Sequence, residues 1–459
     1  MQLLGHSCFT TDRTNSEGHL TIGGCDAIDL ARRFGTPLYV MDEAAIRRAC
    51  RAYVQSFSSR YPKVQIMYAG KAMMNKAIAL LVMSEGLALD VCSAGELHTV
   101  LAAGCPASKV FFHGNSKSPD EVEFALEAGI HRFVSDSIDE LKLINALARK
   151  RHEVANVILR LTPGIEAHTH EYIRTGQIDS KFGIVIPNGD AMKAVKFVQG
   201  LANVKLTGFH CHVGSQVFEV EPFVDAVGIM MNFARKVRET TGVVMEELNL
   251  GGGLGIRYNC KDKPIAVDDL AEALVPALSA EASRNGLPLP TLMLEPGRSI
   301  VGDAGTTLYT VNTVKHIEGV RTYVAVDGGM ADNPRVALYQ AEYEAIIANK
   351  ATMAPSETVS IAGNCCESGD MLVWDVKMPP VEAGDTLAVF CTGAYNYSMA
   401  SNYNRHRRPA AVLVADGHAD LISARETYEG LVSLDIVPTR LRAAQRGLSV
   451  AQQPATQLS

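Results

Sequence analysis

The sequence lacks an apolar run of membrane-spanning length, an excess of basic residues and a cysteine pair in metal-ligand spacing. The run AIALLVM is far too short to cross a membrane, and the first residues lack the basic start and apolar core of a secretion signal. A net charge of −7 with scattered Lys and Arg offers no surface for nucleic acid. The ten cysteines, none in C-x-x-C spacing, favour reduced thiols and argue against a structural zinc site. We therefore expect a soluble, cytoplasmic protein that binds neither nucleic acid nor a membrane.

A chain of 459 residues is too long for one compact core, so two domains are expected. From about residue 64 to 300, short β-rich runs alternate with longer stretches whose apolar residues recur every three or four positions. The expected strands are 64–69, 87–91, 110–113, 132–135, 156–162, 205–213, 246–250 and 291–295. Clear helical stretches are 94–104, 118–129, 138–150 and 222–241. This alternation predicts an α/β fold with a parallel (β/α)₈ TIM barrel, which we place at residues 43–304.

The two ends of the chain have a different pattern. After about residue 305 the sequence is β-rich with few long helical stretches, and residues 19–24 and 36–42 also resemble short strands around one helix. We therefore expect one mostly β domain built from residues 1–42 and 305–440. The last stretch, 441–459, is polar and turn-rich, which predicts a flexible tail.

Polar residues interrupt the apolar strands where barrel active sites form, at the carboxyl ends of the strands. They are Lys71 after the first strand, His113 after the third, Arg160 within the fifth, His210 and His212 in the sixth, a glycine triplet after the seventh and Glu295 at the end of the eighth. This pattern predicts that different polar side chains meet at one end of the barrel. Together they indicate an active site more strongly than any single residue does.

Lys71 stands in MYAGKAMM (67–74), an otherwise apolar and small-residue stretch. An ammonium buried without a partner is costly. A low dielectric lowers the pKa of an amine, and the neutral amine can attack a carbonyl to form a Schiff base. The alternatives are that Lys71 pairs with a carboxylate or extends its charged end to solvent.

Two further motifs suit a phosphorylated aromatic cofactor. LNLGGGLG (248–255) ends a strand in three glycines, whose backbone N–H groups could approach a phosphate, although a tight turn explains the glycines equally well. In LEPGR (294–298), Glu295 could face a pyridine nitrogen and keep it protonated, as in pyridoxal 5′-phosphate (PLP) enzymes. Arg298 could then bind a substrate carboxylate, or the two residues could form a surface ion pair.

The histidines of HCHVGSQ (210–216) are two residues apart, hence on one face of a strand. A metal pair is one interpretation, but no third ligand follows at helical spacing, so we expect no metal. Stacking of a histidine on a flat cofactor fits better. The HTH stretch at 168–170 lies in a loop-like region and is expected to matter less.

At this point the sequence resembles the fold-type III PLP-dependent decarboxylases over almost its whole length, and within them the diaminopimelate decarboxylases. The motifs that carry the resemblance are YAGKA, LDVCSAGEL, HGNSKS, PGIEAHTHEYIRTGQIDSKFG, HCHVGSQ, LNLGGGLG, LEPGR, AVDGGMADNPRVALYQAEYEA, CESGD and TGAYNYSMASNYNRHRRP. Such a combination of long motifs does not arise by chance.

The resemblance implies the following roles. Lys71 would hold PLP as a Schiff base, His212 would stack on its ring and Glu295 would contact the pyridine nitrogen. The other cofactor contacts would come from Ser215, Gly252, Gly253, Pro296, Gly297, Arg298 and Tyr395. The substrate contacts would come from Arg298, Arg335, Tyr339, Glu367 and Tyr395. Cys366 would donate a proton to the α-carbon, and Cys366 and Glu367 would come from the neighbouring subunit of a homodimer with shared active sites.

The implied activity is decarboxylation of meso-2,6-diaminopimelate to L-lysine and CO₂, the last step of lysine biosynthesis. Arginines for a carboxylate and Glu367 for an ammonium suit a substrate with an amino acid centre at each end. A related decarboxylase of ornithine, lysine, arginine or carboxynorspermidine remains an alternative. A racemase on the same barrel would carry a tyrosine base where this chain has CESGD. A catalytically inactive decarboxylase-like binding protein would be expected to lose Lys71 or Cys366, and both are present.

Overall fold

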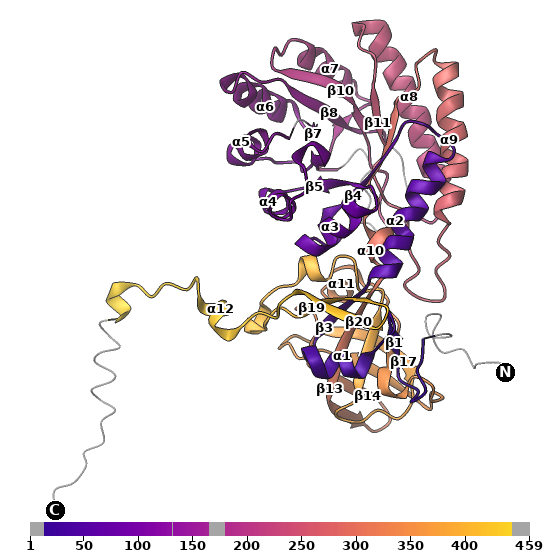
Figure 1. Ribbon diagram of the computed structural model, residues 1–459, viewed down its shortest axis with the longest axis vertical. Coiled ribbons are helices and arrows are strands. Elements are labelled where there is room, and N and C mark those ends of the chain that lie inside the picture. The colour runs from indigo at the N-terminus through magenta and orange to yellow at the C-terminus, as the bar shows by residue number, and fades with distance from the viewer. Residues whose placement is uncertain (1–12, 131, 165–179, 443–459) are drawn as a thin grey trace, which may run out of the picture.

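The computed structural model describes residues 13–130, 132–164 and 180–442. Its first large sheet is a closed barrel of eight parallel strands, in which each strand pairs with the next along the chain and the last pairs with the first (Figure 1). The strands are β4 (Val64–Ala69), β5 (Ala88–Val91), β6 (Val110–Phe112), β7 (Arg132–Ser135), β8 (Ala155–Thr162), β10 (Val204–His210), β11 (Glu247–Asn249) and β12 (Thr291–Leu294). The predicted TIM barrel is therefore confirmed. A short strand, β9 (Ile184–Val185), pairs with β8 outside the ring.

Helices surround this barrel (Figure 1). They are α2 (Glu43–Ser58), α3 (Lys76–Ser84), α4 (Ala94–Ala102), α5 (Pro119–Glu127), α6 (Ile138–Lys150), α7 (Asp190–Gln199), α8 (Glu221–Thr241) and α9 (Val267–Arg284), with a short α10 (Arg298–Val301) after β12. Serine caps start three of them, because the hydroxyls of Ser93, Ser118 and Ser137 accept a backbone N–H of the first turn. Along α8 the apolar residues recur on the face that is buried. No described helix is long and apolar enough to cross a membrane.

The interior of the barrel is filled at one level by an apolar layer. Six strands each contribute one buried side chain to it: Met67, Ala88, Phe111, Val134, Ile158 and Met293. The barrel is thus a packed core rather than a pore, and its polar residues gather beyond the carboxyl ends of the strands.

The second large sheet is mostly antiparallel and combines both ends of the chain, as predicted (Figure 1). Its strands are β3 (Leu38–Asp42), β13 (Gly305–Ile317), β14 (Arg321–Val326), β15 (Ala345–Ile347), β16 (Glu357–Ala362), β17 (Met371–Met378), β18 (Thr386–Phe390), β19 (Ala410–Ala415) and β20 (His418–Ser423). β3, from the N-terminal part, lies between β13 and β19. A small hairpin of β1 (Thr21–Ile22) and β2 (Cys25–Asp26) and the helix α1 (Ala27–Phe34) precede β3.

Two expectations need adjustment. The sixth barrel strand ends at His210 rather than at residue 213, so His212 lies in the loop beyond it. Beyond this strand the chain turns toward the glycine-rich loop, and the N–H of Val217 binds the carbonyl of Gly253. The chain end also differs, because α12 (Tyr428–Val432) and the residues that follow project away from the sheet (Figure 1). Most of the predicted tail, residues 443–459, lies outside the described residues.

Candidate active site

A cavity of about 720 Å³ lies at the carboxyl ends of the barrel strands. Residues from both sheets' domains line it, including eight that the sequence analysis singled out for the site: Lys71, His212, Ser215, Glu295, Arg298, Arg335, Tyr339 and Tyr395. His113, Arg160 and His210 line it as well. The structure thus brings the polar residues from separate strand ends into one chamber.

Lys71 lies on a single 3₁₀ turn, η1 (Gly70–Ala72), directly after β4, with its side chain open to the cavity. Burial disfavours its charge, but the opposing influence of Tyr395, Cys92 and Asp90 is larger and raises the pKa of Lys71 above its usual value. The low pKa predicted from the apolar sequence context is therefore wrong. Asp90 comes from the neighbouring strand β5, which the local sequence around the lysine does not reveal.

Glu295 follows β12 directly and is buried in the cavity wall. Its Oε1 lies 2.8 Å from Nε2 of His113 and accepts a 2.6 Å hydrogen bond from Nδ2 of Asn249. Its Oε2 lies 3.3 Å from Nε2 of His210. Burial alone would raise the pKa of Glu295, but the two histidines outweigh this and hold it well below its usual range. The carboxylate is therefore kept ionised.

The two histidines beside Glu295 pack edge to face, with ring centroids 5.1 Å apart. Burial lowers the pKa of His210 to about 4, so its ring is neutral near pH 7 and can donate the Nε2 hydrogen to Glu295. His113, His210 and Glu295 also have ligand atoms within 4.8 Å of one another, the spacing of a metal site. Glu295 already takes part in hydrogen bonds with Asn249 and His210, and His113 lies within ion-pair distance of it.

His212 occupies the loop after β10 and also lines the cavity. Burial and the positive charges of Lys71 and Arg160 lower its pKa well below the usual value. Its ring is therefore neutral, as suits packing against a flat aromatic group. The ring lies close to Gly251, where an added Cβ would stand 2.7 Å from Nδ1 of His212.

The glycine-rich loop after β11 is tightly packed. A Cβ at Gly252 would stand 2.1 Å from the carbonyl oxygen of Glu295, and one at Gly253 would stand 2.4 Å from that of Gly214. Gly253 also has a φ of +119°, which L side chains rarely adopt. Close backbone approach therefore requires both glycines. Pro296 lies beside them and accepts the N–H of Ala69, and Gly297 immediately precedes α10.

Two arginines lie in the cavity with aromatic rings around them. Arg298 donates through Nη2 to the hydroxyl of Ser215 at 2.9 Å and through Nη1 to the hydroxyl of Tyr258. Its guanidinium lies 4.7 Å from the ring centroid of Tyr395. Arg335, at the start of α11 (Arg335–Tyr339), lies at the same distance, 4.7 Å, from the ring of Tyr258. Tyr258 thus contacts both guanidinium groups, and this positions two cations side by side.

Cys366 and Glu367 are not part of this chamber in their own chain. They are exposed on the loop between β16 and β17, and neither lines the cavity. The loop has a defined shape, because Asp370 accepts the N–H groups of Met330 and Cys365, and Asn404 accepts that of Cys366.

Comparisons with known proteins identify the relatives of the chain. A family profile described as "Pyridoxal-dependent decarboxylase, pyridoxal binding domain" matches residues 43–302. The diaminopimelate decarboxylase of Bacillus subtilis is 51% identical over 426 residues, which cover 93% of this chain and 97% of that protein. That of Staphylococcus aureus is 43% identical, with 93% and 99% covered. The chain belongs to the diaminopimelate decarboxylase family.

Solved structures agree with this family. The crystal structure of diaminopimelate decarboxylase from M. jannaschii in complex with L-lysine superposes with a TM-score of 0.87 at 39% identity, covering 94% of this chain and 100% of that one. The lysine/ornithine decarboxylase of Vibrio vulnificus reaches a TM-score of 0.73 at 23% identity, over 85% and 97% of the two chains, which shows a shared fold alone.

The family is pyridoxal-dependent, and the cavity fits that cofactor. It offers a lysine amine for the aldehyde, an ionised carboxylate for a ring nitrogen, and a serine hydroxyl at a glycine-rich turn for a phosphate. Nε of Arg298 is buried and has no hydrogen-bond partner among the described residues. A donor left over in this way is consistent with an anionic ligand.

Sequence reasoning missed several residues of this family's cavity. Asp90 carries the same signal as Lys71, a charge within an apolar strand, and burial raises its pKa to about 6. Tyr258 stands in a stretch with no unusual pattern, and Cys92 was given no role although it belongs to the motif LDVCSAGEL; their position in space identifies both. The stretch at 168–170 lies outside the described residues.

Proposed function

We propose that this chain decarboxylates meso-2,6-diaminopimelate to L-lysine and CO₂ in a PLP-dependent reaction, the last step of lysine biosynthesis. The observation that carries the proposal is the meeting of Lys71, Glu295 and two arginines in one cavity, in a chain 51% identical to a diaminopimelate decarboxylase. PLP, when bound, withdraws the electron pair that remains on the α-carbon after CO₂ departs.

In this proposal Lys71 holds the cofactor covalently and His212 packs against its ring. Glu295 retains the proton on the pyridine nitrogen, supported by its ionised state and by the neutral His210 that donates to it. The phosphate lies at Ser215, Gly252, Gly253 and the backbone of Pro296, Gly297 and Arg298. Tyr395 contacts the cofactor from the β domain. Its φ of +62° is unusual for a bulky residue, and its N–H binds the carbonyl of Ala72 beside Lys71.

The substrate contacts belong to the same proposal. Arg298 and Arg335 bind carboxylate groups, since planar guanidinium groups donate paired hydrogen bonds to carboxylates. Tyr339 and Tyr395 border the substrate. Glu367 binds the distal ammonium group, which selects a substrate with an amino acid centre at each end. Cys366 donates the proton to the α-carbon after CO₂ has left.

A homodimer with shared active sites follows from the position of Cys366 and Glu367. Both are exposed and neither lines the cavity of its own chain, which supports their supply by a second copy if they act on the substrate. We propose residues 43–304 as the PLP-binding domain and residues 1–42 with 305–440 as the β-rich domain. We also propose a cytoplasmic location, which the nine free cysteines among the described residues support.

The test is a substrate comparison with purified protein and added PLP. Meso-diaminopimelate, L-ornithine, L-lysine and L-arginine are each incubated with the protein, and CO₂ and the amine products are measured. The proposal expects L-lysine from diaminopimelate and no product from the others, with loss of activity in Lys71→Ala. Turnover of another amino acid instead would keep the cofactor chemistry but overturn the substrate. A bound cofactor without turnover of any of them would indicate an inactive binding protein.

A further inference from the structure

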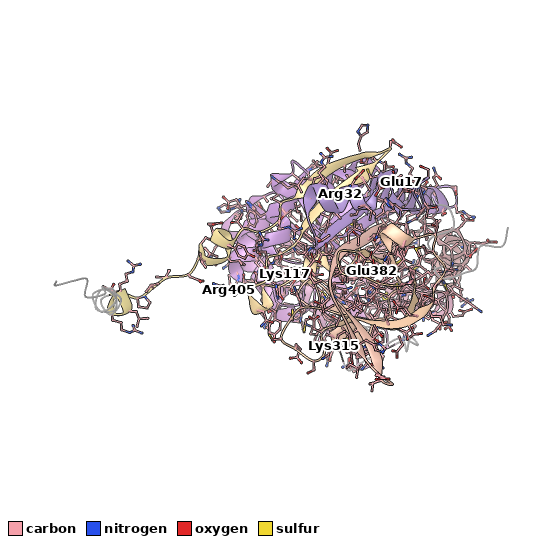
Figure 2. The ribbon with its side chains drawn as sticks, turned by 90° about the horizontal axis from the view of Figure 1, so that it is seen from below. Glu17, Arg32, Lys117, Lys315, Glu382 and Arg405 are labelled. Atoms are coloured by element: carbon pink, nitrogen blue, oxygen red, sulfur yellow. The ribbon has the colours of Figure 1, made fainter. Side chains whose placement is uncertain are left out.

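The C-terminal arm, defined here as residues 426–442, exposes a series of apolar side chains. It leaves β20, forms the one-turn α12 and continues away from the body of the molecule, as both views show (Figures 1 and 2). Leu434 is 91% exposed and Ile436 is 86% exposed. Tyr428, Val432, Val437 and Leu441 are exposed as well. Several large apolar side chains exposed along one segment favour an interaction site in a soluble protein.

The direction of the arm is fixed at its base. Arg405 forms an ion pair with Asp435, and Figure 2 labels this arginine beside the start of the arm. The guanidinium of Arg407 lies 4.4 Å from the ring centroid of Tyr428. Glu426 accepts the N–H of Arg408 at 2.9 Å. These contacts tie the base of the arm to residues 405–408 of its own chain, while the side chains of Leu434 and Ile436 remain exposed.

The segment that anchors the arm also anchors the loop of Cys366. Oδ1 of Asn404 accepts the N–H of Cys366 at 2.8 Å, and the next residue, Arg405, holds Asp435. Asn404 and Arg405 both have positive φ values, 49° and 60°, in a short stretch that serves both contacts. The arm and the exposed loop therefore project from one corner of the β domain.

We propose that the C-terminal arm packs its apolar side chains against a second copy of this chain and clasps the dimer in which the active sites are shared. This inference rests on the proposed function, because the loop of Cys366 and Glu367 must reach the cavity of the other copy. A surface that shares its base with that loop is then brought to the same partner. Burial of Leu434 and Ile436 against the second copy removes apolar surface that one chain leaves in water.

The first test is the dimer dissociation constant of the full chain with PLP, measured by sedimentation equilibrium. Leu434→Asp with Ile436→Asp is compared with Val320→Asp, a control at an apolar residue that is 73% exposed on the turn between β13 and β14. The double variant should weaken the dimer at least about 100-fold, since each buried aliphatic side chain contributes roughly tenfold or more. Equal dissociation constants for the double variant and the control would overturn the proposal.

Limited trypsin digestion of the wild type is a second test that needs no variant. Arg440 and Arg442 are exposed in the single chain, so cleavage there should be fast below the dimer dissociation constant and slow above it. Protection that does not change with protein concentration would mean that the arm folds onto its own chain, which contradicts the proposal.

The visible absorption of bound PLP separates this inference from the proposed function. A double variant that binds PLP but sediments as a monomer supports the clasp. If the wild-type protein is a monomer at all concentrations and still makes L-lysine, both the role of the arm in the dimer and the shared active site are contradicted. A wild type that dimerises through the arm without binding PLP overturns the proposed function alone.

Discussion

Nε2 of His113 lies 2.8 Å from Oε1 of Glu295 in the wall of the cavity that holds Lys71. The histidine comes from the end of β6 and the glutamate from the end of β12, so the contact crosses the mouth of the barrel. It joins the hydrogen bonds from His210 and Asn249 to the same carboxylate. Three residues from three strand ends thus surround the carboxylate of Glu295.

Substitution of His113 should change the protonation of the cofactor. His113→Leu removes one partner of Glu295 in a buried site, so the carboxylate holds the pyridine proton less well. We expect kcat to fall about 10- to 100-fold, the range found when residues that support metal ligands are removed. The ¹⁵N chemical shift of ring-labelled PLP should move toward that of a neutral pyridine. His113→Gln keeps an N–H donor and should recover much of the loss. An unchanged shift in the leucine variant would show that His113 does not act on Glu295.

Loading of the apoprotein with PLP should accelerate as the pH rises. The pKa of Lys71 is raised above its usual value, so the amine is protonated near neutral pH and only the small neutral fraction attacks the aldehyde. That fraction grows about tenfold for each pH unit below the pKa. Stopped-flow absorbance between pH 7 and pH 9 measures the rate. A loading rate that does not change across this range would mean that the amine of Lys71 is already neutral. Lys71→Ala is the control for absorbance changes that do not involve this amine.

Arg335→Lys should weaken substrate binding more than it slows the chemical step. The guanidinium of Arg335 is buried and donates to the hydroxyl of Tyr343 at 2.7 Å, which holds the guanidinium plane in one orientation. A lysine ammonium lacks these paired, planar donors. KM for diaminopimelate should rise about 10- to 100-fold, as expected for lost hydrogen bonds between charged groups. Tyr343→Phe, which removes only the supporting hydroxyl, should have a smaller effect. A fall in kcat at constant KM would contradict a binding role.

Mixing of two inactive variants tests whether the active sites are shared. Lys71→Ala and Cys366→Ala, refolded or exchanged together in equal amounts, should regain about a quarter of wild-type activity, because half of the dimers are mixed and hold one intact site. Lys71→Ala mixed with Glu295→Ala is the matched control, since both changes lie in the same cavity and every site stays defective. Equal recovery in both mixtures, or none in either, would argue against Cys366 acting in the partner's cavity.

The stability of the barrel should depend on one buried ion pair. Nζ of Lys117 lies 2.7 Å from Oε1 of Glu140 and also donates to the carbonyls of Gly114 and Val134. Lys117→Met leaves the carboxylate of Glu140 buried without its partner, which should cost about 3–5 kcal/mol of unfolding free energy. Lys193→Met breaks an exposed pair with Asp190 and should leave the unfolding midpoint almost unchanged. Urea denaturation followed by circular dichroism compares the two variants. Equal unfolding midpoints would show that the Lys117–Glu140 pair contributes no more to stability than the exposed pair.

Much of the fold could be predicted because its signals are local. Each barrel strand is a short apolar run between helical stretches, three of which begin with a serine cap, and all eight strands were found within a few residues. In the β domain the signals are weaker: the residues of β17 do not alternate between buried and exposed, and its pairing with β16 shifts register twice. The end of β10 was placed too late because HCHV continues the apolar pattern after pairing stops.

The site was less predictable where it depends on distant residues. Lys71, Glu295 and Arg298 were identified because a charged residue beside an apolar strand is conspicuous. The raised pKa of Lys71 depends on neighbours from other elements. Tyr258 contacts two arginines that lie 40 and 77 positions away in the chain, and nothing in its own stretch indicates this.

The most direct measurement is the location of the cofactor. Reduction of the PLP-loaded protein with borohydride fixes the cofactor to the lysine that carries it, and peptide mass spectrometry identifies that residue. We predict a single pyridoxyl group on Lys71, formed in step with the loss of L-lysine production from meso-diaminopimelate. A pyridoxyl group on another lysine, or inactivation without any modification of Lys71, would contradict the account.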